Sequence, residues 1–323
     1  MLERSLHRHE VRLLLVVLLL IAALALTTAH FFTLQNLFDL LTTYAFTGIL
    51  AAGLLVVLVS GGIDISFTAT ASVAQYVAVS LATAAGIGWA GLFAVALAVG
   101  LALGLVNALI ITSLRLSSII ATVATLNLFY GVLVFFTHGN YIYTLPDYLS
   151  EGVNWPIGGG HAINLQILLL VVTFLGIWLL LNHSNIGRQI YAMGGNPEAA
   201  KRVGINVFGL TLFAYGIMGL CAGIASIADA QLEQSVMPTA LVGKELHVLA
   251  AVVLGGASLT GGVGSVFGTI LGVALLAIAE NGLIILGVPS YWLDFFAGVL
   301  ILLAVSSTAL EYGLGRPRKV AAS

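Results

Sequence analysis

Few residues of this chain could act on a solute or a partner, because charged side chains make up only 7% of its 323 residues. One of them, Asp64, follows the helix-breaking pair Gly61 and Gly62 within an apolar region. An ionisable group in such surroundings is costly and is expected to shape or line a polar pathway. The alternative is that the Asp64 carboxylate, helped by Ser66, caps the helix that follows. The residues alone leave both interpretations open.

A second group of polar residues, from Asn196 to Gly204, has the pattern of a short, complete helix. Its asparagine suits the N-cap, a proline follows at the first helical position, and glycine suits the end. Glu198 falls in the first turn and Lys201 and Arg202 in the last, which complements the helix dipole. A helix this short is marginal unless it packs against something.

Two interpretations of this helix remain. It could lie on lipid headgroups, with its basic pair facing phosphate. It could instead contact a cytoplasmic protein through the small apolar face formed by Ala199, Ala200 and Val203.

No motif for covalent chemistry accompanies these residues. The nearest approach to a phosphate-binding loop is Gly243-Lys244, but Glu245 follows it and Pro238 stands where the first glycine belongs. Neither a metal site nor another cofactor is predicted in this chain. The net charge of -2 gives no indication of a nucleic-acid partner.

The elements that position these residues follow from the spacing of charges. The intervals 13–38, 65–114, 152–187 and 203–228 contain no charged residue, and each could hold at least one membrane crossing of roughly 20 apolar residues. The sequence predicts an all-α polytopic membrane bundle, one domain over residues 1–323, with about ten transmembrane elements and a range of eight to ten. Their expected centres are Val17, Leu50, Val73, Leu101, Thr125, Val171, Tyr215, Val252, Leu271 and Leu300.

Two of the predicted elements are expected to be broken, near Gly61-Gly62 and near Gly255–Gly262. The eighth element is short enough to be a half-helix. Residues 59–66 are weakly similar in sequence to residues 253–260, and matched helix breaks of this kind mark binding regions in transporters. The first apolar stretch, Leu13 to Leu26, is expected to be a retained span, since it is long for a secretory signal.

Lys and Arg in short loops predict the orientation. They place residues 1–12, the loop 183–206 and the tail 311–323 in the cytoplasm, so both termini are expected inside. The loop 138–162 has acidic and aromatic residues but no Lys or Arg, and is expected outside.

Three stretches resemble a known family. Residues 187–200, followed by Gly204-Ile205-Asn206, resemble the coupling loop of bacterial ABC importer permeases of the ribose-type sugar branch. Gly61–Ser66 and Val253–Ser265 are similar to two further signatures of that branch. The match departs at Phe67-Thr68, where the branch commonly has Val-Gly.

This resemblance implies a permease subunit that moves a monosaccharide or similar small polar solute across the bacterial inner membrane by alternating access. It implies a second permease subunit, identical or related, an external solute-binding protein, and cytoplasmic subunits that bind ATP and Mg. The residues that would couple to those ATPase subunits are Asn196, Pro197, Glu198, Ala199, Ala200, Lys201, Arg202 and Gly204.

Two sets of residues are candidates for the pathway. The first lies at the helix breaks: Gly61, Gly62, Asp64, Ser66, Gly255, Gly256 and Ser258. The second is polar or aromatic, lies within spans and could contact a solute: Tyr44, Gln75, Asn107, Asn127, Phe129 and Tyr130. Glu280, Asn281 and Asp294 are interpreted as helix ends at the membrane interface.

Glycines spaced small-xxx-small predict close helix packing, preferably within one subunit. The clearest pairs are Gly100 with Gly104 and Gly219 with Gly223. Two other function classes stay open: a secondary transporter driven by protons or sodium, which shares broken helices and a midplane acid, and a membrane scaffold without a pathway.

Overall fold

The computed structural model describes residues 2–28, 30–158 and 161–289, together with the single positions 292, 295, 298, 299 and 302. The expected span near Leu300, the residue Asp294 and the tail 311–323 lie outside the described residues.

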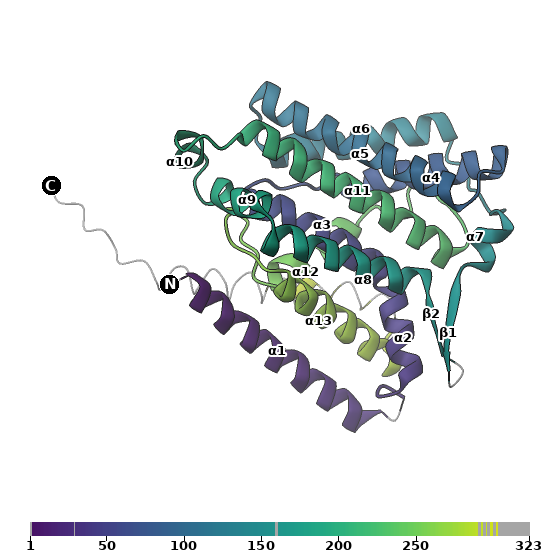
Figure 1. Cartoon of the computed structure of the whole chain (residues 1–323). Coiled ribbons are helices and arrows are strands. Elements are labelled where there is room, and N and C mark those ends of the chain that lie inside the picture. Colours follow the sequence, from purple (N-terminus) through teal and green to yellow (C-terminus); the bar gives the residue numbers. More distant parts are fainter. Residues whose placement is uncertain are drawn as a thin grey trace.

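The described residues form a bundle of helices with one small hairpin at the end away from α10 (Figure 1). The helices are α1 Leu2–Thr27, α2 Leu34–Thr43, α3 Ala45–Val59, α4 Phe67–Ala85, α5 Trp89–Leu114, α6 Ser118–Thr137, α7 Asp147–Glu151, α8 Leu165–Trp178, the π-helix η1 Leu179–His183, α9 Asn185–Gly195, α10 Pro197–Arg202, α11 Val207–Glu233, α12 Lys244–Leu254 and α13 Val266–Ile285. The strands β1 Asn154–Gly158 and β2 His161–Asn164 pair antiparallel.

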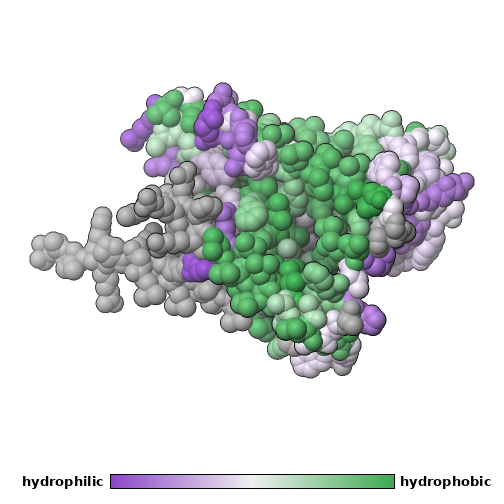
Figure 2. Space-filling model, turned by 60° about the horizontal axis from the view of Figure 1, so that its bottom comes forward, coloured by the Kyte–Doolittle hydropathy of each residue, from purple (hydrophilic) through white to green (hydrophobic). Residues whose placement is uncertain are grey.

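Six helices in the described part are long and apolar enough to cross a membrane, namely α1, α5, α6, α8 with η1, α11 and α13. The pair α2 and α3, bent by 53° at Tyr44, could make a seventh. Hydrophobic side chains form a broad band across the middle of the molecule, and hydrophilic ones gather at its two ends (Figure 2). This confirms a helical, multi-pass membrane protein, while the number ten stays a prediction.

Two of the expected elements differ from simple spans. The helix around Val73, α4, is not among the six, because polar side chains such as Thr68, Ser72 and Gln75 interrupt it. The helix around Val252, α12, has 11 residues and is about 16 Å long, roughly half of the 30 Å needed. The expectation of a half-helix is therefore correct. The β-hairpin and helix α7 in the segment 138–162 were not predicted.

The two broken helices end in the same way. After α3, the N–H groups of residues 60, 61 and 62 donate to the carbonyls of residues 56, 58 and 57. After α12, residues 255, 256 and 257 donate to residues 251, 253 and 252. This pattern is the Schellman motif of helix C-termini, which requires a left-handed residue. Gly61 (φ +90°) and Gly256 (φ +89°) take that position. The two segments are therefore similar in structure as well as in sequence. At the helix ends Gly61 corresponds to Gly256, one residue later than in the alignment of residues 59–66 with 253–260.

Close packing of α5 against α11 organises the bundle. A Cβ added to Gly219 would lie 2.1 Å from the Gly100 carbonyl oxygen, and one added to Gly104 would lie 2.3 Å from the Tyr215 carbonyl oxygen. The two helix backbones are in direct contact. The small-residue spacing thus serves packing within one subunit, as predicted.

Replacing Gly219 with alanine should destabilise the bundle by about 1–3 kcal/mol, because the added methyl group overlaps the α5 backbone. The matched control is Gly176→Ala in α8, where no atom of the described residues lies within 4 Å of the added Cβ. That variant should gain about 0.5–1 kcal/mol from the better helix propensity of alanine. Thermal unfolding in detergent measures both, and equal stability of the two variants would show that α5 and α11 are not packed this closely.

Candidate functional site

Helix α10 is an exposed, fully capped turn at one end of the bundle (Figure 1). The Asn196 side chain accepts the Ala199 N–H at 3.0 Å, and Pro197 opens the helix. Gly204, at φ +85°, follows its end. Glu198 pairs with Lys201 at 2.9 Å on the surface. The predicted caps, the proline at the first position and the placement of the charges are all present.

The apolar face of α10 is smaller than predicted. Ala200 is buried against the protein, because it sits on the side of the helix that faces the bundle. Ala199 is exposed and Val203 keeps 76% of its surface accessible. The outer face therefore consists of Ala199, Val203 and the charged residues Glu198, Lys201 and Arg202.

The expected loop 183–206 is helical for most of its length. The π-helix η1 and helix α9 lead into α10, with Asn196 as the hinge-like residue in extended conformation (φ -160°) between α9 and α10. The Ser184 side chain caps α9 by accepting the Gly187 N–H at 2.9 Å.

Behind α10, two glycine turns meet the glycine end of helix α9 backbone to backbone. We call the contact of residues 59–62, 194–195 and 261–262 the glycine junction. The Gly262 N–H donates to the Val59 carbonyl at 2.9 Å and so links the two helix breaks. A Cβ on Gly194 would lie 1.8 Å from the Val59 carbonyl oxygen and 2.6 Å from the Gly262 nitrogen. The end of α9 therefore packs against both helix breaks, and Asn196, the N-cap of α10, follows directly.

Two further contacts hold this junction. The Tyr191 hydroxyl donates to the Gly264 carbonyl at 2.8 Å, which ties α9 to the segment before α13. Burial, and to a lesser degree the negative charge of Glu10, raises the pKa of Tyr191 to about 12, so the hydroxyl stays protonated as a donor. The Ser265 hydroxyl donates to the Glu10 carboxylate of α1.

Asp64 lies in the turn between α3 and α4 and is buried. Its carboxylate accepts the Ser66 N–H at 2.8 Å and the Ser66 hydroxyl at 2.7 Å. It therefore braces the residue before α4 and does not cap the helix N–H groups directly. Ser66 in turn accepts a hydrogen bond from Asn107 of α5 at 2.7 Å. A similar turn follows α12, where the Ser258 hydroxyl accepts the Thr260 N–H at 3.2 Å.

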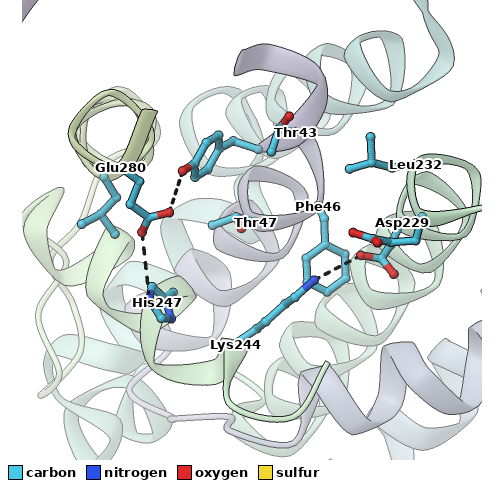
Figure 3. A pocket seen from close by; sticks show the side chains of 11 residues that line it. Thr43, Phe46, Thr47, Asp229, Leu232, Lys244, His247 and Glu280 are labelled. Carbon is cyan, nitrogen blue, oxygen red and sulfur yellow. Dashed lines mark hydrogen bonds and ion pairs between the residues drawn. The ribbon is translucent and has the colours of Figure 1, made fainter. Parts of the chain in front are cut away.

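A cavity of about 350 Å³, drawn in Figure 3, lies near the end of α11 that is far from α10. Asp229 in its wall is about 30 Å along α11 from Val207, the residue with which that helix begins next to α10. Five elements converge on it: the α2–α3 bend, α3, α11, α12 and α13. Its lining is Thr43, Tyr44, Phe46, Thr47, Asp229, Leu232, Glu233, Lys244, His247, Leu276 and Glu280.

Polar side chains from facing helices interact across this cavity. Lys244 lies over the Phe46 ring, 4.9 Å from its centroid, and approaches Asp229 at 3.4 Å. The Tyr44 hydroxyl donates to Glu280 at 2.6 Å, and His247 approaches the other oxygen of Glu280 at 3.9 Å. These interactions join α3, α11, α12 and α13 around one polar space (Figure 3).

The predicted solute contacts are only partly brought together. Tyr44 lines the cavity. Gln75 is behind it and donates to Asp229 at 2.8 Å. Asn107 belongs to the Asp64 turn. Asn127 is exposed on α6 and bonds to its own helix at the Val123 carbonyl.

Phe129 and Tyr130 of α6 do not reach the cavity lining either. Phe129 is buried in packing, and the Tyr130 hydroxyl is buried beside Thr68 and Ser72 of α4.

Sequence reasoning missed the charges of the cavity. Glu280 is not at a helix end: α13 continues to Ile285, and Asn281 exchanges hydrogen bonds with Asn36 of α2. The turn signal at Gly282 was misleading, because that glycine makes room for Leu24 of α1, 2.6 Å from an added Cβ. The usable signal was a carboxylate inside an otherwise apolar helix, which also applies to Asp229.

Replacing Gly194 with alanine should disrupt the glycine junction, whereas Gly195→Ala should not. Within the part of the chain that the structure describes, no atom lies within 4 Å of a Cβ on Gly195, so the two adjacent substitutions differ mainly in contact with Val59. Hydrogen exchange followed by mass spectrometry should show faster exchange at residues 59–62 and 261–264 in Gly194→Ala only. Equal protection in both variants would mean that the end of α9 and the two turns are not in contact.

The chain is similar to known proteins over most of its length. The family model described as "Branched-chain amino acid transport system / permease component" matches residues 36–305. The chain is 37% identical to the ribose import permease protein RbsC of Escherichia coli K12 over 299 residues, which is 92% of either chain. It is 33% identical to the autoinducer 2 import system permease protein LsrC of Yersinia enterocolitica, over 92% of this chain and 81% of that one. No solved structure matches significantly. Together with the apolar helices and the capped helix α10, these matches show that the chain belongs to the branched-chain amino acid transport system permease family, among the permeases of ABC sugar importers.

Proposed function

We propose that this chain is the membrane subunit of an ATP-driven importer in the bacterial inner membrane. It translocates a monosaccharide or a similar small polar solute by alternating access. It pairs with a second permease subunit, receives solute from an external binding protein, and is driven by cytoplasmic ATPase subunits that bind ATP and Mg. The relatives named for import of ribose and of autoinducer 2 support this solute class.

The observation that carries the proposal is the position of α10. It is exposed, rigidly capped, and followed by the half-exposed Phe208 at the start of α11. Such a helix is suited to fit a groove on a partner and to move as one body. Its basic residues, together with Arg188, favour the cytoplasmic side for this end of the bundle. The cavity then lies toward the outside, where a binding protein would release solute.

The glycine junction supplies a route from α10 to the cavity. A displacement of α10 moves the end of α9, and Gly194 is in contact with both Val59 and Gly262. Val59 ends α3, which carries Phe46 at its other end. The turn at Gly262 follows α12, which carries Lys244 and His247 at its start. ATP binding on the partner would thus move the cavity walls without any covalent step in this chain.

One observation favours a second candidate, an ion-coupled secondary transporter. The carboxylates Asp229 and Glu280 lie inside the bundle and could bind a proton or sodium. Uptake of this kind would collapse with an ionophore and survive ATP depletion, whereas the importer would show the opposite dependence.

Glu198→Lys should uncouple ATP hydrolysis from uptake in the reconstituted importer. The Glu198–Lys201 pair is exposed, with side-chain accessibilities of 73% and 55%, so little folding stability depends on it. Uptake per ATP hydrolysed should fall about tenfold or more, as expected when a charge at a docking contact is reversed.

The matched control is Glu151→Lys, which makes the same charge reversal on α7, at the far end of the bundle. It should leave the ratio of uptake to hydrolysis unchanged. Normal coupling in Glu198→Lys would refute the role of α10.

A further inference from the structure

We propose that Thr68 of α4 and Glu245 of α12 form a latch that holds one wall of the cavity in place until nucleotide binds to the partner, and that the latch opens in each transport cycle. This inference rests on the proposed function, because it names the contact that regulates movement of that wall. The Thr68 hydroxyl donates to one oxygen of the Glu245 carboxylate. Thr68 is fully buried, and Glu245 is 8% exposed.

The latch joins two groups of helices on either side of the cavity. Helix α4 packs on α5, α6 and α11, whereas α12 packs mainly on α13 and α3 and only lightly on α4. Helix α3 contacts both groups. Figure 3 shows Asp229 of α11 and Glu280 of α13 on opposite sides of the cavity. The bond between Thr68 and Glu245 therefore fixes how far α12 can move from the group that contains α4.

Helix α12 is built to move as one body. It has 11 residues and lies between two glycines with left-handed backbone, Gly243 at φ +94° and Gly256 at φ +89°. Glycine permits backbone rotation at both ends of the helix. No atom of the described residues lies within 4 Å of a Cβ on Gly243, so packing does not restrain this glycine. The start of α12 is thus held largely by the polar side chains that follow Gly243.

The latch holds the start of α12 more firmly than the neighbouring ion pair does. The Lys244 ammonium group is 3.4 Å from the Asp229 carboxylate, and its side chain is 40% exposed. Glu245 lies in the first turn of α12, where the helix dipole favours a negative charge. A hydroxyl that donates to a buried carboxylate makes a strong bond, because water does not compete for it. The Tyr130 hydroxyl of α6 lies in the same buried space, beside Thr68.

Thr68 can be changed without removing the cap of α12. The other oxygen of Glu245 accepts the Gly243 N–H at 2.8 Å, and this bond does not involve Thr68. Thr68 also stands where the ribose-type branch commonly has glycine, which has no hydroxyl. Opening the latch by substitution at Thr68 therefore leaves the other contacts of Glu245 in place.

Four variants of α4 test the latch. Thr68→Val removes the hydroxyl and keeps the shape, whereas Thr68→Ser keeps the hydroxyl. Thr68→Gly introduces the residue common in the ribose-type branch and replaces Thr68→Val if that variant does not fold. The matched control is Thr70→Val, because the Thr70 hydroxyl is also buried on α4 but makes no hydrogen bond within the described residues. A thermal melt of each variant identifies those that are folded.

Hydrogen exchange of the purified full chain in lipid nanodiscs measures how often α12 opens, without any partner. Residues 244–254 should exchange about tenfold or more faster in Thr68→Val than in the wild type, as expected when a buried hydrogen bond to a charged group is lost. Thr68→Ser and Thr70→Val should exchange at the wild-type rate. Equal exchange in Thr68→Val and Thr70→Val would overturn the inference.

ATP hydrolysis by the importer reconstituted with the proposed ATPase subunits distinguishes a latch from a purely structural contact. Without solute, hydrolysis should rise by up to about tenfold in Thr68→Val, because α12 no longer resists movement of α9 and α10 through the glycine junction. Thr68→Ser should restore the wild-type rate. A structural defect alone would lower hydrolysis and uptake together, so an unchanged or lower rate in folded Thr68→Val would also overturn the inference.

The two arms separate failure of the latch from failure of the proposed function. If either arm fails while the wild type still imports solute with ATP, the latch is wrong and the importer stands. If the reconstituted wild type shows no ATP-driven uptake, the proposed function falls and the role of the latch in transport falls with it.

Discussion

The structure depends on how interrupted helices satisfy their backbone groups inside a membrane bundle. In lipid, a broken helix is tolerated only where its free N–H and C=O groups meet protein or line a cavity. Here α3 and α12 both end within the bundle, and the Gly262 N–H donates to the Val59 carbonyl across the gap. Glycine is required because any Cβ at Gly194 would overlap that carbonyl. The need to satisfy the backbone thus brings the two breaks and the end of α9 to one point.

The same arrangement connects the two ends of the molecule. The short helix α10 follows directly after the glycine junction, while α3 and α12 run from that junction to the polar cavity. Close glycine contacts join α5 to α11, and α11 packs against α3. Packed protein interiors transmit displacement because they are stiff. Motion imposed at α10 would therefore reach the cavity as a shift of whole helices.

Sequence reasoning was accurate where the determinants are local. Capping residues define α10, and the spacing of Gly100 and Gly219 predicts close helix contact, because both patterns depend on a few neighbouring positions. It failed for the cavity, whose charged residues come from three helices and meet only in the folded chain. Glu280 was assigned to a helix end because Asn281-Gly282 resembles a turn, although that glycine accommodates a side chain of α1. The contact between Gly282 and Leu24 leaves no local signal, whereas a carboxylate inside an otherwise apolar helix does.

The central claim is that a change at α10 moves the helices around the cavity. The distance between two labels across the cavity end, measured with and without nucleotide, tests it most directly. The chain has one cysteine, the buried Cys221, so labels can be placed at Tyr143→Cys near the end of α11 and at Leu246→Cys on α12, both well exposed. Pulsed electron paramagnetic resonance on the complex with the proposed ATPase subunits should show a changed distance when nucleotide binds about 30 Å away, beside α10. A distance distribution that is identical with and without nucleotide, in a complex that still imports solute, would contradict the account.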